Sequence, residues 1–278
     1  MDQDRSISTE LFSHIATELF PSIATQMRYA LSNIHLAAVA MAPPEEREKD
    51  PELDQNAALL DQSYYQLLRL VNNLNAAASL REPELPALQD CDLAELMNSV
   101  CNRCVSLADL MQIRLSFVCA VPCLICAVCR DSMEQLLYQL LSNALKFTPA
   151  GGAITVELKT AGEWVLLSVA DTGTGIEPEL LPSLFDRYLH KDLMNPSPHG
   201  LGLGLPVCRR IAEGHGGNIF AESKPGTGTK VTLSIPLRRT GNPLVRDVPF
   251  DYSGGFNKTL LALSDALPRK AFLQQNQD

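Results

Sequence analysis

Two long runs of apolar residues at helical spacing constrain the first third of this chain more than any other feature. The first run extends over Ile7–Met41 and the second over Leu53–Ala78, with apolar side chains three or four positions apart. Pro43–Pro44 and the charged stretch 45–50 interrupt the pattern between the two runs. This arrangement predicts two long amphipathic helices joined by a polar loop, which together form an antiparallel hairpin.

A single hairpin of this kind cannot cover the apolar stripes of both of its helices. We therefore expect residues 1–86 to pair with a second copy, so that the homodimer forms a four-helix bundle. The alternative is a hairpin that packs against its own downstream domain.

From about residue 90 the pattern changes to alternating helices and strands. The expected helices cover residues 91–111, 132–145 and a segment ending near Gly214, and the expected strands cover 114–120, 123–128, 153–159, 164–170, 218–223 and 230–236. Residues 87–238 therefore read as an α/β sandwich in which helices cover one sheet. The fold class is α+β, and residues 239–278 form a tail with one short helix, at 257–267.

Composition excludes several classes of function. The 278 residues are 46% hydrophobic and carry a net charge of −9, which argues against nucleic-acid binding. The apolar run Phe117–Cys129 contains Pro122 and is shorter than the roughly 18 residues of a membrane helix. The first eleven residues lack the apolar segment of a signal peptide. We expect a soluble, cytoplasmic protein without a membrane span.

Eight cysteines raise the question of a metal site. The spacing Cys101-x-x-Cys104 and the series Cys119, Cys123, Cys126 and Cys129 could suggest one. Residues three apart in a strand point to opposite faces, however, so Cys123 and Cys126 would not converge on one ion. We interpret the cysteines as small, buried core residues.

Three motifs follow one another within the second domain. The first is Asn143-Ala-Leu-Lys-Phe-Thr-Pro149, at the end of an expected helix. Asn143 and Lys146 lie three apart and share a helix face. The amide oxygen could bind Mg²⁺ and the ammonium could bind phosphate. An ordinary polar helix end is the alternative.

The second motif is Asp171-x-Gly173-x-Gly175-Ile, directly after an expected strand. Its carboxylate could accept a hydrogen bond from an exocyclic amine such as that of adenine, although the same residues could form a simple hairpin turn. The third is Gly200-x-Gly202-x-Gly204, which opens a helix whose N-terminus could face a phosphate. It lacks the context of a dinucleotide-binding fingerprint or a P-loop.

Together, the motifs from about residue 90 to 238 resemble the ATP-binding domain of sensor histidine kinases, in the superfamily of gyrase and the mismatch-repair ATPases. Asn143–Pro149 resembles the N box, Asp171–Ile176 and Gly200–Leu205 the two glycine boxes, and Leu184–Arg187 the F box. Gly226–Thr229 resembles the terminal Gly-Thr turn.

The resemblance implies an ATP·Mg²⁺ site with a mobile lid over 189–199. It implies that Asn143 binds Mg²⁺, that Lys146 and Arg187 contact phosphate, and that Asp171 reads adenine with the Thr229 hydroxyl in support. The residues it assigns to the nucleotide are Asn143, Lys146, Phe147, Asp171, Gly173, Gly175, Arg187, Gly200, Leu201, Gly202, Leu203, Gly204 and Thr229. Gln139 and Cys129 depart from the usual pattern, at positions that often hold Asn and an acidic residue, and His215 is expected to be structural.

The hairpin departs further from the family pattern. A histidine kinase carries His followed by Glu or Asp, and then Pro five residues after the His. Here Glu18 and Pro21 could correspond, but Thr17 stands at the histidine position and the spacing is one residue short. His14 lies four residues before Glu18, so the two side chains can meet on one helix face. His14 is the candidate phosphoacceptor and Glu18 its candidate base.

These features favour a two-component histidine kinase that passes a phosphoryl group from ATP to a histidine and then to a response-regulator aspartate. It would have no sensor domain of its own. A pseudokinase or ATP-gated interaction scaffold is the alternative, since the usual phosphoacceptor motif is absent. A serine/threonine kinase of the anti-sigma type shares the ATP fold, but the resemblance implies that this class has no hairpin.

Overall fold

The computed structural model describes residues 2–79, 87–186, 202–241 and 257–276; at the two ends of the hairpin, in residues 2–20 and 74–79, it describes the backbone alone. The chain forms two compact units. One comprises residues 1–83 together with 272–278, and the other comprises residues 84–271. We call them the hairpin unit and the sandwich unit.

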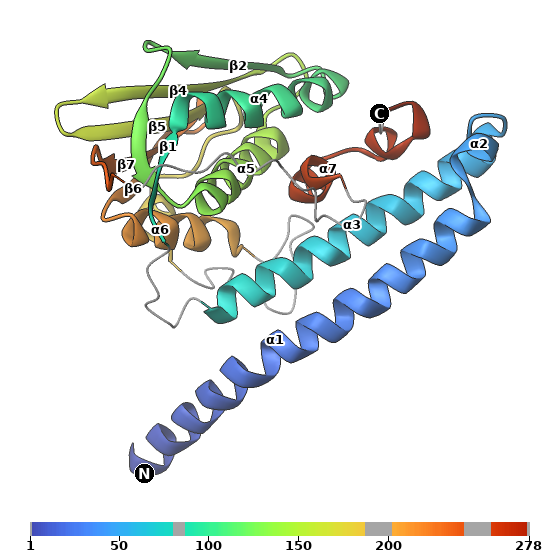
Figure 1. Ribbon diagram of the computed structural model, residues 1–278, viewed down its shortest axis with the longest axis horizontal. Helices are drawn as coiled ribbons and strands as arrows, with labels where there is room; N and C mark the ends of the chain where they lie inside the picture. Colours follow the sequence, from blue (N-terminus) through green and yellow to red (C-terminus); the bar gives the residue numbers. More distant parts are fainter. Residues whose placement is uncertain (1, 80–86, 187–201, 242–256, 277–278) are drawn as a thin grey trace. The chain divides into compact units, whose positions relative to one another are not determined.

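The hairpin unit consists of α1 (Asp2–Met41), the short helix α2 (Pro44–Arg47) and α3 (Pro51–Ser79). The two long helices pack along each other, as predicted (Figure 1). The expected polar loop contains α2, which has proline at its first turn, where a missing N–H costs nothing. Asp50 then begins α3, because its Oδ1 accepts the main-chain N–H groups of Glu52 at 2.9 Å and Leu53 at 3.2 Å.

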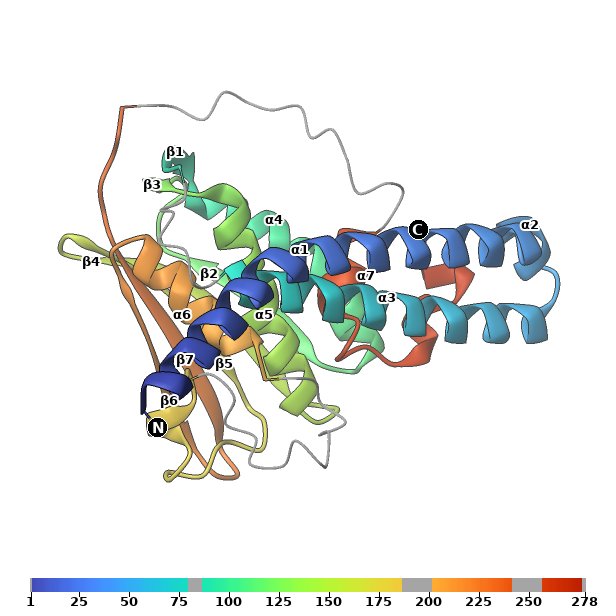
Figure 2. The same cartoon turned by 90° about the horizontal axis from the view of Figure 1, so that it is seen from below.

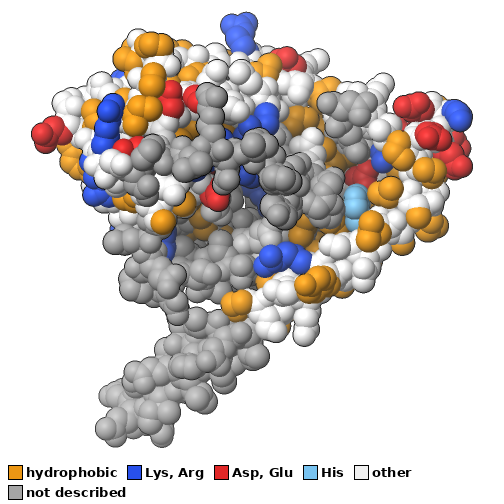
Figure 3. Space-filling model, in the orientation of Figure 1, with side chains coloured by type: hydrophobic (Ala, Val, Ile, Leu, Met, Phe, Trp, Pro, Cys, Tyr) orange, Lys and Arg blue, Asp and Glu red, His pale blue; other side chains and the backbone are white. Residues whose placement is uncertain are grey.

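The described part of α1 has apolar residues on two faces. Ala24 and Leu31 are buried, at 5% and 8% exposure. Ile23, Met27 and Ile34 point away from that face and are 46%, 40% and 59% exposed. Spacings of four and seven residues place these three side chains in one stripe. The hairpin therefore leaves part of its apolar surface uncovered, as the sequence predicts (Figure 3).

The sandwich unit contains the remaining regular elements. Its helices are α4 (Leu93–Leu110), α5 (Arg130–Phe147), α6 (Gly204–Gly214) and α7 (Lys258–Leu263), and its strands are β1 (Gln89–Asp92), β2 (Arg114–Cys119), β3 (Ile125–Val128), β4 (Ala153–Ala161), β5 (Trp164–Asp171), β6 (Asn218–Lys224) and β7 (Gly228–Pro236). Short 3₁₀ turns lie at Leu181–Ser183, Arg269–Phe272 and Gln274–Asn276.

A five-stranded sheet in the order β2-β4-β5-β7-β6 forms the centre of this unit. The β2–β4 pair is parallel and the other pairs are antiparallel. Helices α4, α5 and α6 cover one face of the sheet (Figures 1 and 2). Ile154 and Val156 of β4, Leu167 of β5 and Leu233 of β7 are each at most 1% exposed in the resulting core. The α/β sandwich is confirmed.

The structure contains one strand that the sequence pattern did not predict. Residues 89–92 pair with β3 in a separate two-stranded sheet, so the expected helix at 91–111 begins at Leu93 instead. Asp92 caps this helix, because its Oδ1 accepts the N–H groups of Ala94 at 3.0 Å and Glu95 at 3.4 Å.

The short helix expected at 257–267 is present as α7, over Lys258–Leu263, with Asn257 as its N-cap. It packs on α5. The Lys258 ammonium pairs with the Glu134 carboxylate, which also pairs with Arg103 of α4. Thr259 Oγ1 lies 3.0 Å from the Tyr138 hydroxyl. Part of the tail is thus built into the sandwich unit.

The prediction that the cysteines are buried core residues is confirmed for only part of them. Cys91, Cys101, Cys104, Cys126 and Cys208 are buried, and burial raises the pKa of Cys101, Cys104 and Cys208 to about 12. Cys119 and Cys129 are half-buried and Cys123 is exposed, because residue 123 precedes β3 rather than lying within it. Among the described residues, no three His, Cys, Asp or Glu side chains come together as a metal site.

No helix in the described part of the chain is both long enough and apolar enough to cross a lipid bilayer.

Candidate functional site

Asp171 stands at the end of β5, where the strand gives way to a glycine turn. Its Oδ1 accepts the main-chain N–H of Gly173 at 2.8 Å and that of Thr229 at 3.3 Å. Burial raises the pKa of this carboxyl group, and the two N–H donors act in the opposite direction. Both donors bind the same oxygen, and no hydrogen bond within the described residues involves Oδ2. Among the described residues, Oδ2 of the half-buried Asp171 is therefore open to an external donor.

The glycines of this turn are required by close approaches of the main chain. A Cβ on Gly173 would lie 2.5 Å from the Phe147 carbonyl oxygen at the end of α5. Gly175 has a φ of +71°, and a Cβ there would lie 2.2 Å from the Lys224 carbonyl oxygen. The Thr174 N–H donates to the Phe147 carbonyl oxygen at 3.2 Å. The glycine turn after Asp171 therefore packs between the end of α5 and the turn that connects β6 to β7.

Thr229 supports Asp171 by a different group from the one expected. The resemblance implied a contribution from its hydroxyl, but the main-chain N–H makes the contact with Asp171. The hydroxyl instead lies 2.9 Å from the Ser223 hydroxyl. The reason is the antiparallel register of three strands. Thr229 of β7 lies opposite Asp171 of β5 on one side and opposite Ser223 of β6 on the other.

Helix α5 carries the residues of the first motif. Asn143 and Lys146 are half-buried, and Phe147 is 45% exposed at the last position of the helix. Because the Phe147 carbonyl oxygen accepts the Thr174 N–H, the end of α5 lies directly against the Asp171 turn. The structure therefore brings the first and second motifs together.

The described part of the third motif also contacts α5. Gly202 has a φ of +67°, Leu203 is 5% exposed, and Gly204 is the first residue of α6. A Cβ on Gly204 would lie 3.0 Å from Oε1 of Gln139, one of the departures from the family pattern. The buried Gln139 amide of α5 thus lies at the N-terminus of α6, where main-chain N–H groups lack helical partners.

His215 links the end of α6 to the start of α5. Its Nε2 accepts the main-chain N–H of Cys129, the N-cap of α5, at 3.0 Å. Its Nδ1 lies 2.7 Å from the Ile211 carbonyl oxygen of α6 and donates to it. Burial lowers the pKa of this imidazole, which is 1% exposed. These contacts agree with a structural role for His215. Cys129 takes part in this contact through its main-chain N–H rather than through its side chain.

Several predicted residues lie outside the part that the structure describes. Arg187, Gly200, Leu201 and the expected lid at 189–199 belong to this group. His14 and Glu18 lie in α1, within the stretch where only the backbone is described. The contacts of these side chains stay predictions.

One histidine contact was not visible in the sequence. His35 of α1 has no acidic residue within a helical turn, yet its Nδ1 lies 3.8 Å from Oδ1 of Asp61 on α3. The ring also stacks on Tyr64, with centroids 4.4 Å apart. Burial lowers the pKa of His35, while Asp61 acts to raise it. Only the pairing of α1 with α3 brings these residues together.

A surface cavity of about 340 Å³ lies at the edge strand β6, and Phe185 of the F box lines it together with Arg209 of α6. None of its lining residues is among those assigned to the nucleotide. Arg209 is half-exposed and pairs with Asp186 and Glu213, both at 3.0 Å. The cavity is therefore separate from the Asp171 turn.

Comparison with known proteins identifies the domain that carries these motifs. Residues 129–239 match the family described as histidine kinase-, DNA gyrase B-, and HSP90-like ATPase. This part of the chain is an ATPase domain of that family. The match extends from the N-cap of α5 to just beyond β7, and so it contains Asn143, Asp171 and Gly204.

The chain is also similar to sensor kinases. It is 32% identical over 192 residues to the sensor protein SrrB of Staphylococcus aureus, covering 68% of this chain and 32% of that protein. It is 32% identical over 174 residues to the sensor protein KdpD of Clostridium acetobutylicum, covering 61% of this chain and 19% of that protein. The chain thus spans about a third or less of these relatives.

A solved structure extends the likeness beyond the ATPase domain. Full-length ShkA, in complex with AMPPNP, aligns with a TM-score of 0.64 and 25% identity over 82% of this chain and 47% of that one. The resemblance to sensor histidine kinases is confirmed, as is the order of a helical region followed by a sheet-based ATPase domain.

Proposed function

We propose that this protein is an ATP-binding histidine kinase of a two-component system. The observation that carries the proposal is the Asp171 carboxylate, held by two main-chain N–H groups on one oxygen, directly beside the end of α5. It lies within a histidine kinase-type ATPase domain. The AMPPNP complex of ShkA supports an adenine nucleotide as the ligand.

The half-buried carboxylate suits the recognition of adenine. Burial disfavours the charged form of Asp171, so an additional N–H donor would stabilise it. The exocyclic amine of adenine is such a donor. Gly173 leaves no side chain between the carboxylate and the end of α5, which allows the base to approach closely.

Asn143 and Lys146 suit the phosphates. They lie one turn apart on α5, and Asn143 offers an amide oxygen, the type of ligand that Mg²⁺ prefers while it keeps most of its water and phosphate ligands. A bound Mg²⁺ would supply positive charge that stabilises the charge developing on the transferred phosphoryl group. Lys146, Arg187 and the N-terminus of α6 would hold the phosphate oxygens, with Gln139 beside that N-terminus.

For phosphoryl transfer we propose His14 as the acceptor. An imidazole nitrogen of His14 attacks the γ-phosphorus, the bond to the bridging oxygen breaks, and ADP leaves with that oxygen. Glu18, one helical turn away, accepts the imidazole proton. The phosphoryl group then passes to an aspartate of a response-regulator receiver domain.

We further propose that the protein acts as a homodimer. The stripe formed by Ile23, Met27 and Ile34 on α1 is exposed in the single chain, and Leu60 and Leu67 on α3 are 54% and 47% exposed. Burying these side chains against the same surface of a second hairpin would complete a four-helix bundle.

The second candidate function is a nucleotide-gated scaffold without autophosphorylation. Thr17 stands where the family pattern has its histidine, and Pro21 is one residue too close. In this case nucleotide binding would bias the protein towards one partner-binding state.

Autophosphorylation of the full chain with γ-labelled ATP and Mg²⁺ tests both candidates. The kinase proposal predicts label that is lost in acid, survives alkali and is absent from His14→Ala, while the matched variant His35→Ala keeps it. Acid-stable label would instead indicate a hydroxyl acceptor such as Thr17.

The nucleotide site itself is tested by Asp171→Asn. This variant should bind ATP about 10- to 100-fold more weakly, the range expected for losing a hydrogen bond to a charged group. Glu177→Gln, an exposed neighbour, should bind normally. Normal nucleotide binding without any label would contradict the kinase and favour the scaffold.

A further inference from the structure

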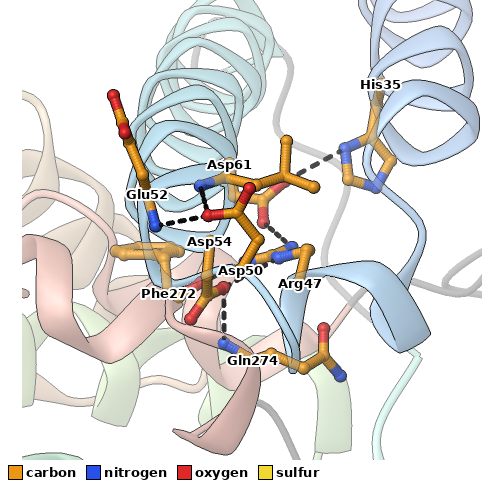
Figure 4. A network of polar contacts seen from close by, with 9 residues as sticks. His35, Arg47, Asp50, Glu52, Asp54, Asp61, Phe272 and Gln274 are labelled. Carbon is orange, nitrogen blue, oxygen red and sulfur yellow. Dashed lines mark hydrogen bonds and ion pairs between the residues drawn. The ribbon is translucent and has the colours of Figure 1, made fainter.

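The hairpin unit holds a segment from the far end of the chain. Near α2, the guanidinium of Arg47 is almost completely buried and donates three hydrogen bonds (Figure 4). Nε donates to Asp54 Oδ1 at 2.8 Å and Nη1 to Asp61 Oδ2 at 2.9 Å. Nη2 donates to the main-chain carbonyl oxygen of Phe272 at 2.9 Å. We call Arg47, Asp54, Asp61 and Tyr65 the C-terminal socket.

The socket recognises the segment at two further points. The main-chain N–H of Gln274 donates to Asp54 Oδ1 at 3.1 Å. The Phe272 ring is fully buried, and its centroid lies 5.7 Å from that of Tyr65. Recognition thus combines one aromatic side chain with a carbonyl oxygen and an N–H two residues apart, a pattern that a short peptide can present.

The socket does not need the segment in order to be assembled. Arg47 pairs with Asp54 and Asp61, both from α3, and neither ion pair includes an atom of the segment. If the segment left, the Arg47 guanidinium would lose its Nη2 contact and keep those of Nε and Nη1. Asp54 Oδ1 would keep Arg47, and the Tyr65 ring would keep its neighbours His35 and Tyr64. The same groups could then take up a peptide again.

Charge favours the same ligand. Helix α2, the first turn of α3 and the residues between them carry five exposed acidic residues, Glu45, Glu46, Glu48, Asp50 and Glu52, against one exposed lysine, Lys49. Acidic side chains gather visibly at this end of the hairpin (Figure 3). The sequence before Phe272 is Arg269-Lys270-Ala271, and no acidic residue lies between 266 and 277. A peptide with this sequence therefore has the opposite charge to the socket's surroundings.

We propose that the C-terminal socket is a peptide-binding site that this chain's own residues 272–276 occupy reversibly. In the segment Phe272 is fully buried, Leu273 is half-buried and Gln275 is exposed, so the apolar area of about two side chains opposes the entropy gained when five residues are released. The ligand class is a basic peptide with an aromatic residue followed two positions later by a free main-chain N–H.

Hydrogen exchange of the unmodified full chain provides the first test. The Gln274 amide should exchange at least ten times faster than the α3 amides near Leu68 and Val71, because the segment opens without unfolding of the helix. Exchange of all these amides at the same slow rate would overturn the proposal. So would a rate that depends on protein concentration, since a second copy would then supply the segment.

A labelled peptide of residues 267–278 provides the second test. By fluorescence anisotropy it should bind the full-length Phe272→Ala chain at least ten times more tightly than the wild-type chain, whose own segment competes. The Gln275→Ala chain should behave like the wild type. A peptide carrying Phe272→Ala should not bind either chain, and one carrying Gln275→Ala should bind normally. Equal binding to all chains, or none to the Phe272→Ala chain, would contradict the proposal.

Discussion

The two units of this protein use their apolar side chains differently. In the sandwich unit, the core positions of β4, β5 and β7 are almost completely buried by helices of the same unit. In the hairpin unit, the stripe of Ile23, Met27 and Ile34 is 40% to 59% exposed. The sandwich unit closes its own core, whereas the hairpin keeps a surface suited to a partner.

The units also differ in what makes their polar sites specific. Around Asp171 the contacts come from main-chain groups, and glycines leave the space they need. In the C-terminal socket the contacts come from the side chains of Arg47, Asp54 and Asp61. A main-chain site depends on backbone conformation, so substitutions that alter the turn should damage it more than substitutions of side chains around it.

The largest expected effect tests this dependence at the β6–β7 turn. Gly228 has a φ of +121°, and a Cβ there would lie 1.9 Å from the Asp171 carbonyl oxygen. We expect Gly228→Ala to lower the free energy of unfolding by about 4 kcal/mol, from unfavourable φ and displaced backbone together. Urea unfolding, monitored through the fluorescence of Trp164, the chain's one tryptophan, measures this loss of stability.

Gly226→Ala is the matched control. Gly226 has a φ of +74° in the same turn, but nothing lies within 4 Å of its Cβ position. Its substitution should cost only about 1–2 kcal/mol. Equal losses for the two variants would show that close packing against Asp171 does not matter.

An intermediate effect is expected in the hairpin. Ile34→Glu places a charge in the exposed stripe, and in a symmetric dimer each substitution counts twice. The dissociation constant of the homodimer should rise at least about 100-fold, because burying each isoleucine contributes about 1.5–3 kcal/mol. Sedimentation equilibrium of the full chain measures it. Asn33→Glu, at the exposed neighbouring position, should leave the dimer intact; dissociation by both variants would exclude the stripe as the interface.

The smallest effect concerns pH. His215 has a lowered pKa in the folded protein, so the unfolded chain takes up the proton first as the pH falls below about 6.5. The stability of the sandwich unit should therefore be complete above that pH and decline below it, by at most about 1.4 kcal/mol per pH unit. His215→Gln should remove this decline in the Trp164 transition.

His35→Gln serves as its control, because His35 belongs to the hairpin unit. The pH dependence of the Trp164 transition should be unchanged in this variant. A decline that persists in His215→Gln would mean that other groups cause it.

Much of the fold could be predicted because it follows from local periodicity. The long helices, the strands of the main sheet and the Asp171 turn each have their pattern within a few residues. Strand β1 has the sequence Gln-Asp-Cys-Asp, which shows no apolar alternation, and it forms only because β3 pairs with it.

The candidate site could be predicted in its residues but not in all of its contacts. The choice between the hydroxyl and the N–H of Thr229 depends on the register of three strands. The His35–Asp61 pair and the burial of Phe272 depend on residues distant in sequence. No local pattern contains that information.

Asp92 has a practical consequence for protein engineering. Its Oδ1 accepts the N–H of Leu124, at 3.0 Å, in addition to those of the first turn of α4. One carboxylate oxygen therefore fixes both the start of a helix and the approach to β3. A chimaera that joins another helical module to this ATPase unit should have its junction before Gln89. A single residue inserted between Gln89 and Leu93 would disturb the contact between Asp92 and Leu124, the residue that precedes β3.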